Sequence, residues 1–280
     1  MGRLHANPSI IAARLWNTAV WVVMIFFLIN VTAMVSTVVV DSFATRWLRT
    51  WLPAGWTTRW YDVAWREFQL TDVLIVTMQI TFAVVALSIL IGVPAAYALA
   101  RREFAGKRLL MLFFLLPMLI PPITYGIPLA TVLYQAHLGG TMIGVILANL
   151  VPTVPFVILV MTPFIEQIDP NLESAARVFG ADLPRVFMRV LVPLLAPGIL
   201  ASSLIVMVRT LGTFELTFLT AGPDSQTLVV ALYYAAFAAG VRANQSIDAM
   251  AVTYMVTTMI WLLIALRFVN PTQLVTRVKT

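Results

Sequence analysis

Two charged residues, Arg209 and Glu215, stand in an otherwise apolar run at 190–219. An arginine near the middle of a bilayer costs about 2.5 to 3.5 kcal/mol on insertion scales, so a charge kept there indicates a functional role. For Glu215 we expect contact with a solute or a cavity, or instead a hydrogen bond between helices or an interfacial position. For Arg209 a bridge to a neighbouring helix or a partner subunit is favoured over contact with a solute.

The spacing of these two residues predicts that they do not pair within one helix. Six residues of α-helix turn by about 600°, which leaves the side chains about 240° apart. Gly212 lies between them, and a break there would alter this geometry. Tyr125 completes the predicted substrate path of Tyr125, Arg209 and Glu215, because it lies in a proline-rich run that we expect to face the interior of the bundle.

The chemistry of enzymes and of metal sites is missing from the sequence. The chain has no cysteine, and its two lysines, Lys107 and Lys279, do not close a GxxxxGK[ST] phosphate loop. The two histidines, His5 and His137, are far apart and have no metal-ligand spacing. No GxSxG elbow occurs. We therefore expect no catalytic residue, no metal and no cofactor in this chain, and no ATP bound through a phosphate loop of its own.

Composition indicates a membrane protein. Of the 280 residues, 61% are hydrophobic and 11% are charged, whereas a soluble domain has about 25% charged residues. Since about twenty apolar residues cross a bilayer, we predict an all-α, polytopic protein with spans at 15–40, 73–99, 109–134, 142–165, 190–219 and 247–268. The first apolar run, of about 26 residues, is expected to be a retained span and no cleaved signal peptide.

Prolines predict where these spans are irregular. The third span contains Pro117, Pro121, Pro122, Gly126 and Pro128. Proline removes a helical hydrogen bond and clashes with the preceding turn, so this span is expected to kink or unwind. Freed carbonyls are tolerated only against protein or a water-lined cavity, so the segment should face the bundle interior. Pro152, Pro155 and Pro163 are expected to bend the fourth span in the same way.

The basic residues predict the orientation. With the N-terminus in the cytoplasm, twelve of the 18 basic residues are cytoplasmic, five are external and Arg209 lies within a span. This arrangement satisfies the positive-inside rule. It places residues 1–14 and the tail 269–280 in the cytoplasm and leaves 73–268 as the core, with a cytoplasmic loop at 166–189. We expect a multi-pass membrane protein with both termini in the cytoplasm.

Two external segments have compositions of their own. The loop 41–72 holds five of the eight tryptophans, which favours interfacial anchoring; a docking surface for an external solute-binding protein is the alternative. The run 228–239 predicts a re-entrant or interfacial helix. Asp248 is expected to be an N-cap or a rim carboxylate of the last span, in preference to a solute contact.

Residues 169–197 contain more polar side chains than a membrane span needs, so this segment has another role. Asp169 is a good N-cap, Pro170 suits the first helical position, and Gly180 suits the residue after the last turn. Asp182 then caps a second helix. Apolar residues at helical spacing give the first helix one apolar face, formed by Leu172, Ala175, Ala176 and Phe179.

This segment resembles the EAA loop of permease subunits of bacterial ABC importers. The resemblance lies in Ser174-Ala175-Ala176, in Gly180, and in the run that ends at Pro193, with the family's spacing. Ser174 replaces the family's usual glutamate, and the acid stands one residue earlier, at Glu173. In the family this loop forms a coupling helix that docks on an ATPase. The resemblance thus implies ATPase-coupling roles for Glu173, Ser174, Ala175, Ala176, Gly180 and Pro193.

The resemblance extends over 56–273 and also implies partners. These are a dimer of cytoplasmic ATP-binding subunits, a second and homologous permease chain, an extracytoplasmic solute-binding protein and membrane lipid, with no nucleic acid. The run 116–129 is similar to polyamine-type permeases, whereas 97–110 is similar to sugar-type permeases. We expect a type I importer permease for a polyamine or another small cationic solute, with a sugar or polyol as the alternative.

Two other classes of function stay open. A secondary transporter or channel would work alone, with Arg209 and Glu215 as an ion relay, and would copurify with no ATPase. An intramembrane enzyme would need a buried catalytic pair, which the charges of the spans do not supply.

Overall fold

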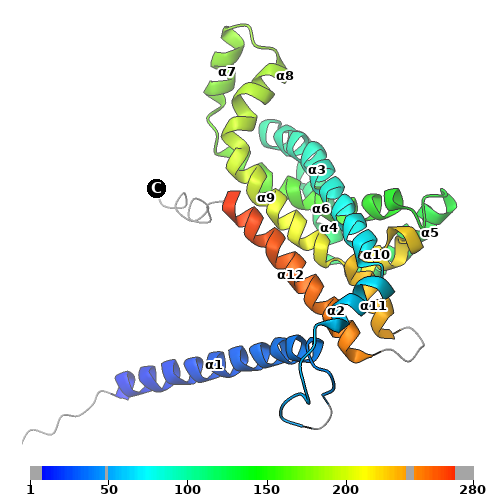
Figure 1. Cartoon of the computed structure of the whole chain (residues 1–280). Helices are drawn as coiled ribbons and strands as arrows, with labels where there is room; N and C mark the ends of the chain where they lie inside the picture. The colour runs from blue at the N-terminus through cyan, green and yellow to red at the C-terminus, as the bar shows by residue number, and fades with distance from the viewer. Residues whose placement is uncertain (1–7, 48–49, 238–242, 269–280) are drawn as a thin grey trace, which may run out of the picture. The chain divides into compact units, whose positions relative to one another are not determined.

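The computed structural model describes residues 8–47, 50–237 and 243–268, which Figure 1 shows as coloured ribbon. The chain divides into two compact units, one of Met1–Ala64 with Gly240–Thr253 and one of Trp65–Ala239 with Tyr254–Thr280. The predicted cytoplasmic tail 269–280 and the first seven residues of the predicted N-terminal segment 1–14 lie outside the described residues.

Among the described residues, five apolar stretches are long enough to cross a membrane. They lie in α1 (Pro8–Ser42), α3 (Leu70–Arg101), α6 (Met142–Glu166), the stretch Leu183–Gly212 and α12 (Asn244–Phe268). A sixth span is present if the bent pair of α4 (Lys107–Leu119) and α5 (Pro122–Gln135) is counted as one. The predicted all-α fold with six spans is therefore confirmed.

In the first unit, the chain after α1 folds back on the end of that helix. The indole nitrogen of the buried Trp60 donates to the carbonyl of Ala44 at 2.7 Å, and the hydroxyls of Ser42 and Tyr61 are 2.8 Å apart. Trp60 is the second residue of α2 (Arg59–Glu67), a short amphipathic helix in the predicted tryptophan-rich loop. In the same loop Trp51 and Trp56 are exposed.

Of the two roles predicted for Asp248, an N-cap or a rim carboxylate, the N-cap is wrong. Helix α12 begins at Asn244, so Asp248 lies in its second turn. Its carboxyl is in hydrogen-bonding contact with Asp41, whose carboxylate also accepts a bond from the Gln245 amide at 3.3 Å. The earlier start follows from residues 244–246, which are polar but compatible with a helix.

The core of the second unit lies between α3 and α6. Its buried residues include Ile80, Val84, Val157, Met161 and Leu195. The two helices approach closely where α3 has Gly92, because a Cβ there would lie 2.6 Å from a methyl carbon of Val157. The buried hydroxyls of Ser88 and Thr153 bond across the same interface at 2.8 Å. These contacts join α3 and α6 along much of their length.

The third span breaks as its prolines predict. Helix α4 ends at Leu119, α5 begins at Pro122, and the two meet at 99°. Ile120 and Pro121 are both extended, with ψ of 132° and 133°, because a residue before proline is driven out of the helical region. Leu119 and Ile123 beside the bend are exposed, whereas α5 buries Gly126, Ala130 and Leu133. Part of the segment that we expect in the interior is therefore buried within this chain, and the bend itself is not.

The fourth span, unlike the third, is not broken at the prolines that were predicted to bend it. Helix α6 runs unbroken through Pro152, Pro155 and Pro163. Pro152 and Pro155 are buried in the core of the unit. Each of these prolines is isolated, so packing against α3 keeps the helix continuous where the Pro121-Pro122 pair in the third span does not.

The fifth span begins earlier and ends earlier than predicted. It consists of α8 (Leu183–Val186), a π-helical turn at Phe187–Leu191 and α9 (Val192–Gly212). Thr213 is extended, and α10 (Glu215–Thr220) follows as a separate short helix. A 3-10 turn at Pro223–Ser225 and α11 (Leu228–Phe237) come next, so a helix is confirmed in the predicted external run.

Candidate functional site

The polar segment after α6 folds as its capping residues predict. Helix α7 (Pro170–Val178) begins after Asp169, whose carboxylate accepts from the backbone N–H of Asn171 at 2.9 Å. Gly180 ends the turn with φ of +83°, a conformation that side chains with a Cβ rarely adopt. Asp182 caps α8 by accepting from the N–H of Arg185 at 3.1 Å. Figure 1 shows α7 and α8 as a hairpin at one end of the second unit.

Glu173 points into the chain from α7. One carboxylate oxygen accepts from Nε of Arg101 at 2.7 Å, and the other accepts from the hydroxyl of Tyr97 at 2.7 Å. The Glu173 side chain is 7% exposed. Arg101 also donates from Nη2 to the carbonyl of Ile168 at 2.8 Å. The acid of the predicted coupling set is thus bonded within the chain.

The rest of α7 turns apolar side chains outward. Leu172, Val178 and Phe179 are exposed by 47%, 85% and 91%. Ser174 and Ala175 are exposed and Ala176 is half-buried. Large apolar side chains on the outside of a short polar helix mark an interaction surface. The predicted apolar face of Leu172, Ala175, Ala176 and Phe179 is therefore presented, in the main, away from the chain.

Pro193 lies beyond the hairpin, at the start of α9 and directly after a π-helical turn of the same continuous helical stretch. The π-helical turn at Phe187–Leu191 precedes α9 and joins it to the hairpin. A π-helical turn has one extra residue and often occurs at functional positions in helices. Pro193 itself is exposed and contributes no contact to the hairpin's caps.

In the second unit, the other two residues of the predicted substrate path lie within electrostatic range of Tyr125. The Tyr125 hydroxyl interacts electrostatically with both Arg209 and Glu215. That hydroxyl is buried, and no described residue bonds to it. The guanidinium of Arg209 lies 5.9 Å from the ring centre of Phe156. Neither Arg209 nor Glu215 forms an ion pair with another described residue.

The break after Gly212 changes the predicted relation between the two charges. Because α9 ends at Gly212 and Glu215 begins α10, the angular separation calculated for one continuous helix does not apply. The predicted alternative, a break at Gly212, is what the structure shows. Arg209 is exposed and Glu215 is half-buried.

Beside this path lies an aromatic cluster that the sequence analysis missed. Phe214 and Phe218 stack with ring centres 5.0 Å apart, and Tyr233 lies 4.9 Å from Phe214. Tyr233 also contacts Tyr234 and Phe237. The sequence spacing could have indicated this cluster. Phe214 and Phe218, at the start of and within α10, are four residues apart, as are Tyr233 and Phe237 on α11. Such rings bind cations through their faces and also stack on apolar faces of other ligands.

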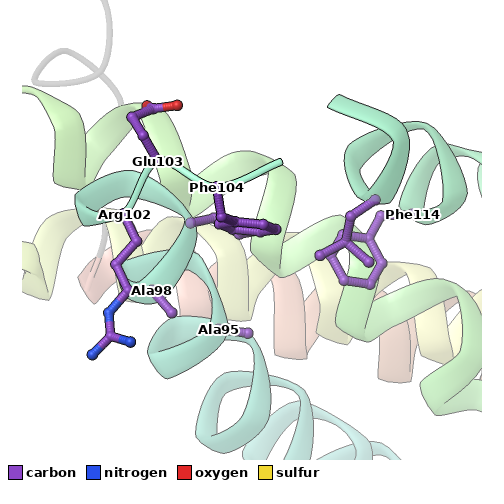
Figure 2. A pocket seen from close by; sticks show the side chains of 8 residues that line it. Ala95, Ala98, Arg102, Glu103, Phe104 and Phe114 are labelled. Atoms are coloured by element: carbon purple, nitrogen blue, oxygen red, sulfur yellow. The ribbon is translucent and has the colours of Figure 1, made fainter. Parts of the chain in front are cut away.

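Two cavities lie near the end of α3 that carries Arg101. One, of about 770 Å³, lies between this end and the hairpin and is lined by Pro94, Arg102, Arg177, Leu183 and Phe187, among others. The other, of about 630 Å³, lies between the ends of α3 and α4. Figure 2 shows that Phe104 and Phe114 face each other in this second cavity, whereas Arg102 and Glu103 point away from it to opposite sides.

Comparison with known proteins gives a family. Residues 88–279 match the family of the binding-protein-dependent transport system inner membrane component. The chain is 34% identical over 138 residues to the trehalose transport system permease protein SugB of Mycobacterium tuberculosis, covering 49% of this chain and 50% of SugB. It is 33% identical over 163 residues to the molybdenum transport system permease protein ModB of Haemophilus influenzae, and this match covers 52% of this chain and 71% of ModB. The chain thus spans about half the length of SugB.

Solved structures show the same fold at low identity. A bacterial ABC transporter involved in the import of the acidic polysaccharide alginate has a chain with a TM-score of 0.76 and 17% identity, covering 92% of this chain and 98% of that one. A chain of the MetNI methionine ABC transporter has a TM-score of 0.53 and 18% identity, and the match covers 71% of this chain and 93% of that one. With the family match over 88–279, these observations establish that the chain belongs to the membrane permease family of ABC importers, whose members are non-catalytic subunits.

Proposed function

We propose that this chain is the permease subunit of an ATP-driven solute importer and forms half of the translocation path. A cytoplasmic ATPase subunit would grip α7 in a groove, and an extracytoplasmic protein would deliver the solute. The observation that carries the proposal is the outward apolar face of α7, with Phe179 and Val178 almost fully exposed. An amphipathic helix in a groove is a common mode of recognition.

The relatives support these partners by analogy. One related structure is an alginate ABC transporter in complex with a periplasmic protein that holds an alginate pentasaccharide. We propose that a second, homologous and different permease chain completes the path in this importer. We further propose that both termini and the α7–α8 hairpin are in the cytoplasm, within the bacterial inner membrane. Because the chain has no cysteine, single cysteines introduced at Phe179 or Trp51 would report the side of the membrane by labelling.

The experiment that tests coupling replaces Gly180. A valine there must adopt φ of +83°, which costs an L-residue roughly 1 to 2 kcal/mol and shifts the hairpin. In proteoliposomes with the ATPase and the binding protein, Gly180→Val is expected to lower solute imported per ATP hydrolysed by about tenfold. Normal coupled uptake in this variant contradicts the assignment.

The chain offers a matched control at Gly106. This residue has φ of +90°, and a Cβ added there, like one added at Gly180, would meet nothing within 4 Å. Gly106→Val therefore has the same local backbone cost but lies between α3 and α4, outside the hairpin. It is expected to leave the transport-to-hydrolysis ratio within about twofold of the unsubstituted protein, since no contact of α7 changes.

For the solute, we propose a polyamine or another small amine. Glu215 has no ion-pair partner among the described residues, and it directly follows Phe214 of the aromatic cluster in the chain. A carboxylate near the faces of aromatic side chains suits the binding of an organic cation. A sugar or polyol is the second candidate, because rings also stack on sugars and because SugB is named for trehalose. Binding of amines or hexoses by the cognate solute-binding protein distinguishes the two.

A further inference from the structure

The last turn of α3 contacts the predicted coupling loop, residues 166–189, at its entry, its middle and its exit. Arg101 donates to the carbonyl of Ile168 at the entry and to Glu173 in α7. Tyr97, one helical turn earlier on the same face, donates to the second oxygen of Glu173. Its ring packs edge-on against Phe187 at the exit, with ring centres 5.7 Å apart. Two residues of α3 therefore hold three points of the loop.

The contact to Glu173 is buried and fully bonded. The side chains of Arg101 and Glu173 are 15% and 7% exposed, and both carboxylate oxygens have a donor. A buried ion pair adds little net stability, but it fixes one geometry because removing either partner leaves an uncompensated charge. The other ion pair near this end of α3, Lys107 with Glu103, differs in that the Glu103 side chain is 89% exposed.

Two routes lead from α7 to the spans. The covalent route passes through α8 and the π-helical turn to α9. The second route is direct, from Glu173 to Arg101 and Tyr97 at the end of α3. Because α3 is joined to α6 through Ser88 and Thr153 and through the close approach at Gly92, a shift of α3 also moves α6.

We propose that Tyr97 and Arg101 are positioning residues that fix α7 to the end of α3, so that a displacement of α7 moves α3 directly. This proposal rests on the proposed coupling function. Glu173 serves it from inside the chain, while the exposed residues of α7 contact the ATPase. The coupling set that the sequence predicts is thereby divided into an inner anchor and an outer contact surface.

The first test measures solute imported per ATP hydrolysed in proteoliposomes with Glu173→Gln. This change removes the charge and keeps the size of the side chain, but the amide can accept only one of the two hydrogen bonds that the carboxylate accepts. The ratio is expected to fall by about tenfold or more while ATPase subunits still copurify with the chain. Tyr97→Phe keeps the ion pair and loses one hydrogen bond, so a fall of about threefold is expected. Glu103→Gln, the matched control, is expected to stay within about twofold.

The second test measures the link itself. The chain has no cysteine, so spin labels at Asn171→Cys on α7 and Arg102→Cys after α3 report one distance. In the otherwise unsubstituted complex this distance is expected to stay constant between the nucleotide-free and ATP-bound states. With Glu173→Gln added, the distance distribution is expected to broaden or to shift on ATP binding.

The outcomes separate this proposal from the proposed function. If the unsubstituted complex imports solute with ATP, and Glu173→Gln couples as well as Glu103→Gln, the anchor is overturned and the coupling function stands. A label distance that changes on ATP binding in the unsubstituted complex overturns the anchor too. If the unsubstituted complex shows no ATP-dependent import, the proposed function itself fails.

Discussion

The two ends of the second unit differ in whether their charged side chains are paired. At the end with the α7–α8 hairpin, the Glu173 carboxylate is buried and paired, and apolar side chains such as Phe179 are exposed. At the other end, near the start of α11, Arg209 and Glu215 have no ion-pair partner among the described residues, and aromatic side chains pack on one another. Helix α3 reaches both ends, since the Thr77 hydroxyl accepts from the N–H of Leu228 at 2.9 Å and Arg101 binds Glu173.

This difference assigns different tasks to the two ends. A satisfied and buried charge holds one geometry and suits the transmission of a displacement. Charges without an ion-pair partner at the end of a span suit a ligand or a partner that arrives later. Thr77 and Arg101 are 24 residues apart on α3, which corresponds to about 36 Å. The same helix thus connects the end proposed to receive force with the end proposed to receive solute.

The largest expected effect comes from removing the arginine of the buried pair. Arg101→Ala leaves Glu173 buried without a counter-charge, so the free energy of unfolding is expected to fall by about 3 to 5 kcal/mol. Denaturation of the detergent-solubilised protein measures the loss. The double variant Arg101→Leu, Glu173→Leu removes both charges and is expected to be close to neutral in stability. Equal stability of the single variant and the starting protein would show that the pair is not buried.

At the opposite end, loss of a charge is expected to change transport and not stability. Glu215→Gln removes a carboxylate that has no ion pair with a described residue, so the free energy of unfolding should change by less than about 0.5 kcal/mol. If the solute is an amine, uptake should fall by about tenfold, which corresponds to about 1.4 kcal/mol. Glu166→Gln, at the hairpin end and also outside any ion pair with a described residue, is the control. Unchanged uptake in Glu215→Gln would exclude the amine path.

The sequence predicts local features of both ends and misses the contacts between distant segments. Asp169, Gly180 and Asp182 could be assigned because capping depends on the residues next to each helix end. The break at Pro121-Pro122 could be assigned because each proline restricts the residue before it. The continuity of α6 could not, because packing against α3 decides whether an isolated proline breaks a helix.

The contacts that the sequence misses lie far apart along the chain. Arg101 and Glu173 are 72 residues apart, and nothing local distinguishes Arg101 from the other basic residues that set topology. The aromatic cluster joins α10 to α11 across a Gly-Pro turn, so its rings meet only in the fold. The path of Tyr125, Arg209 and Glu215 can be predicted as a set because unusual charges in spans are visible without knowledge of the fold.

A smaller effect is expected from Tyr125→Phe. The Tyr125 hydroxyl is buried and has no hydrogen-bond partner among the described residues, so its removal should leave stability unchanged or raise it by up to about 1 kcal/mol. If this hydroxyl bonds to the solute in transit, uptake should fall by about threefold. Concentration-dependent uptake into proteoliposomes measures this change. A variant that is less stable than the starting protein would indicate that the hydroxyl is bonded within the chain.

The smallest effect is expected from Glu103→Gln, which provides the baseline for the comparison of the two ends. Glu103 and Lys107 pair at 2.7 Å with spacing i and i+4, but the Glu103 side chain is 89% exposed. The Lys107 side chain is 14% exposed, so the carboxylate alone distinguishes this pair from the buried one. A pair whose carboxylate stands in water contributes about 0.5 kcal/mol, because water and salt screen that charge. Unfolding at low and at high salt should therefore differ between Glu103→Gln and the starting protein by less than this amount. A loss of stability as large as that of Arg101→Ala would show that burial of the carboxylate is not what distinguishes the two ion pairs. The contrast between the hairpin end, with its buried pair, and the end near α11, with its unpaired charges, would then lose its physical basis.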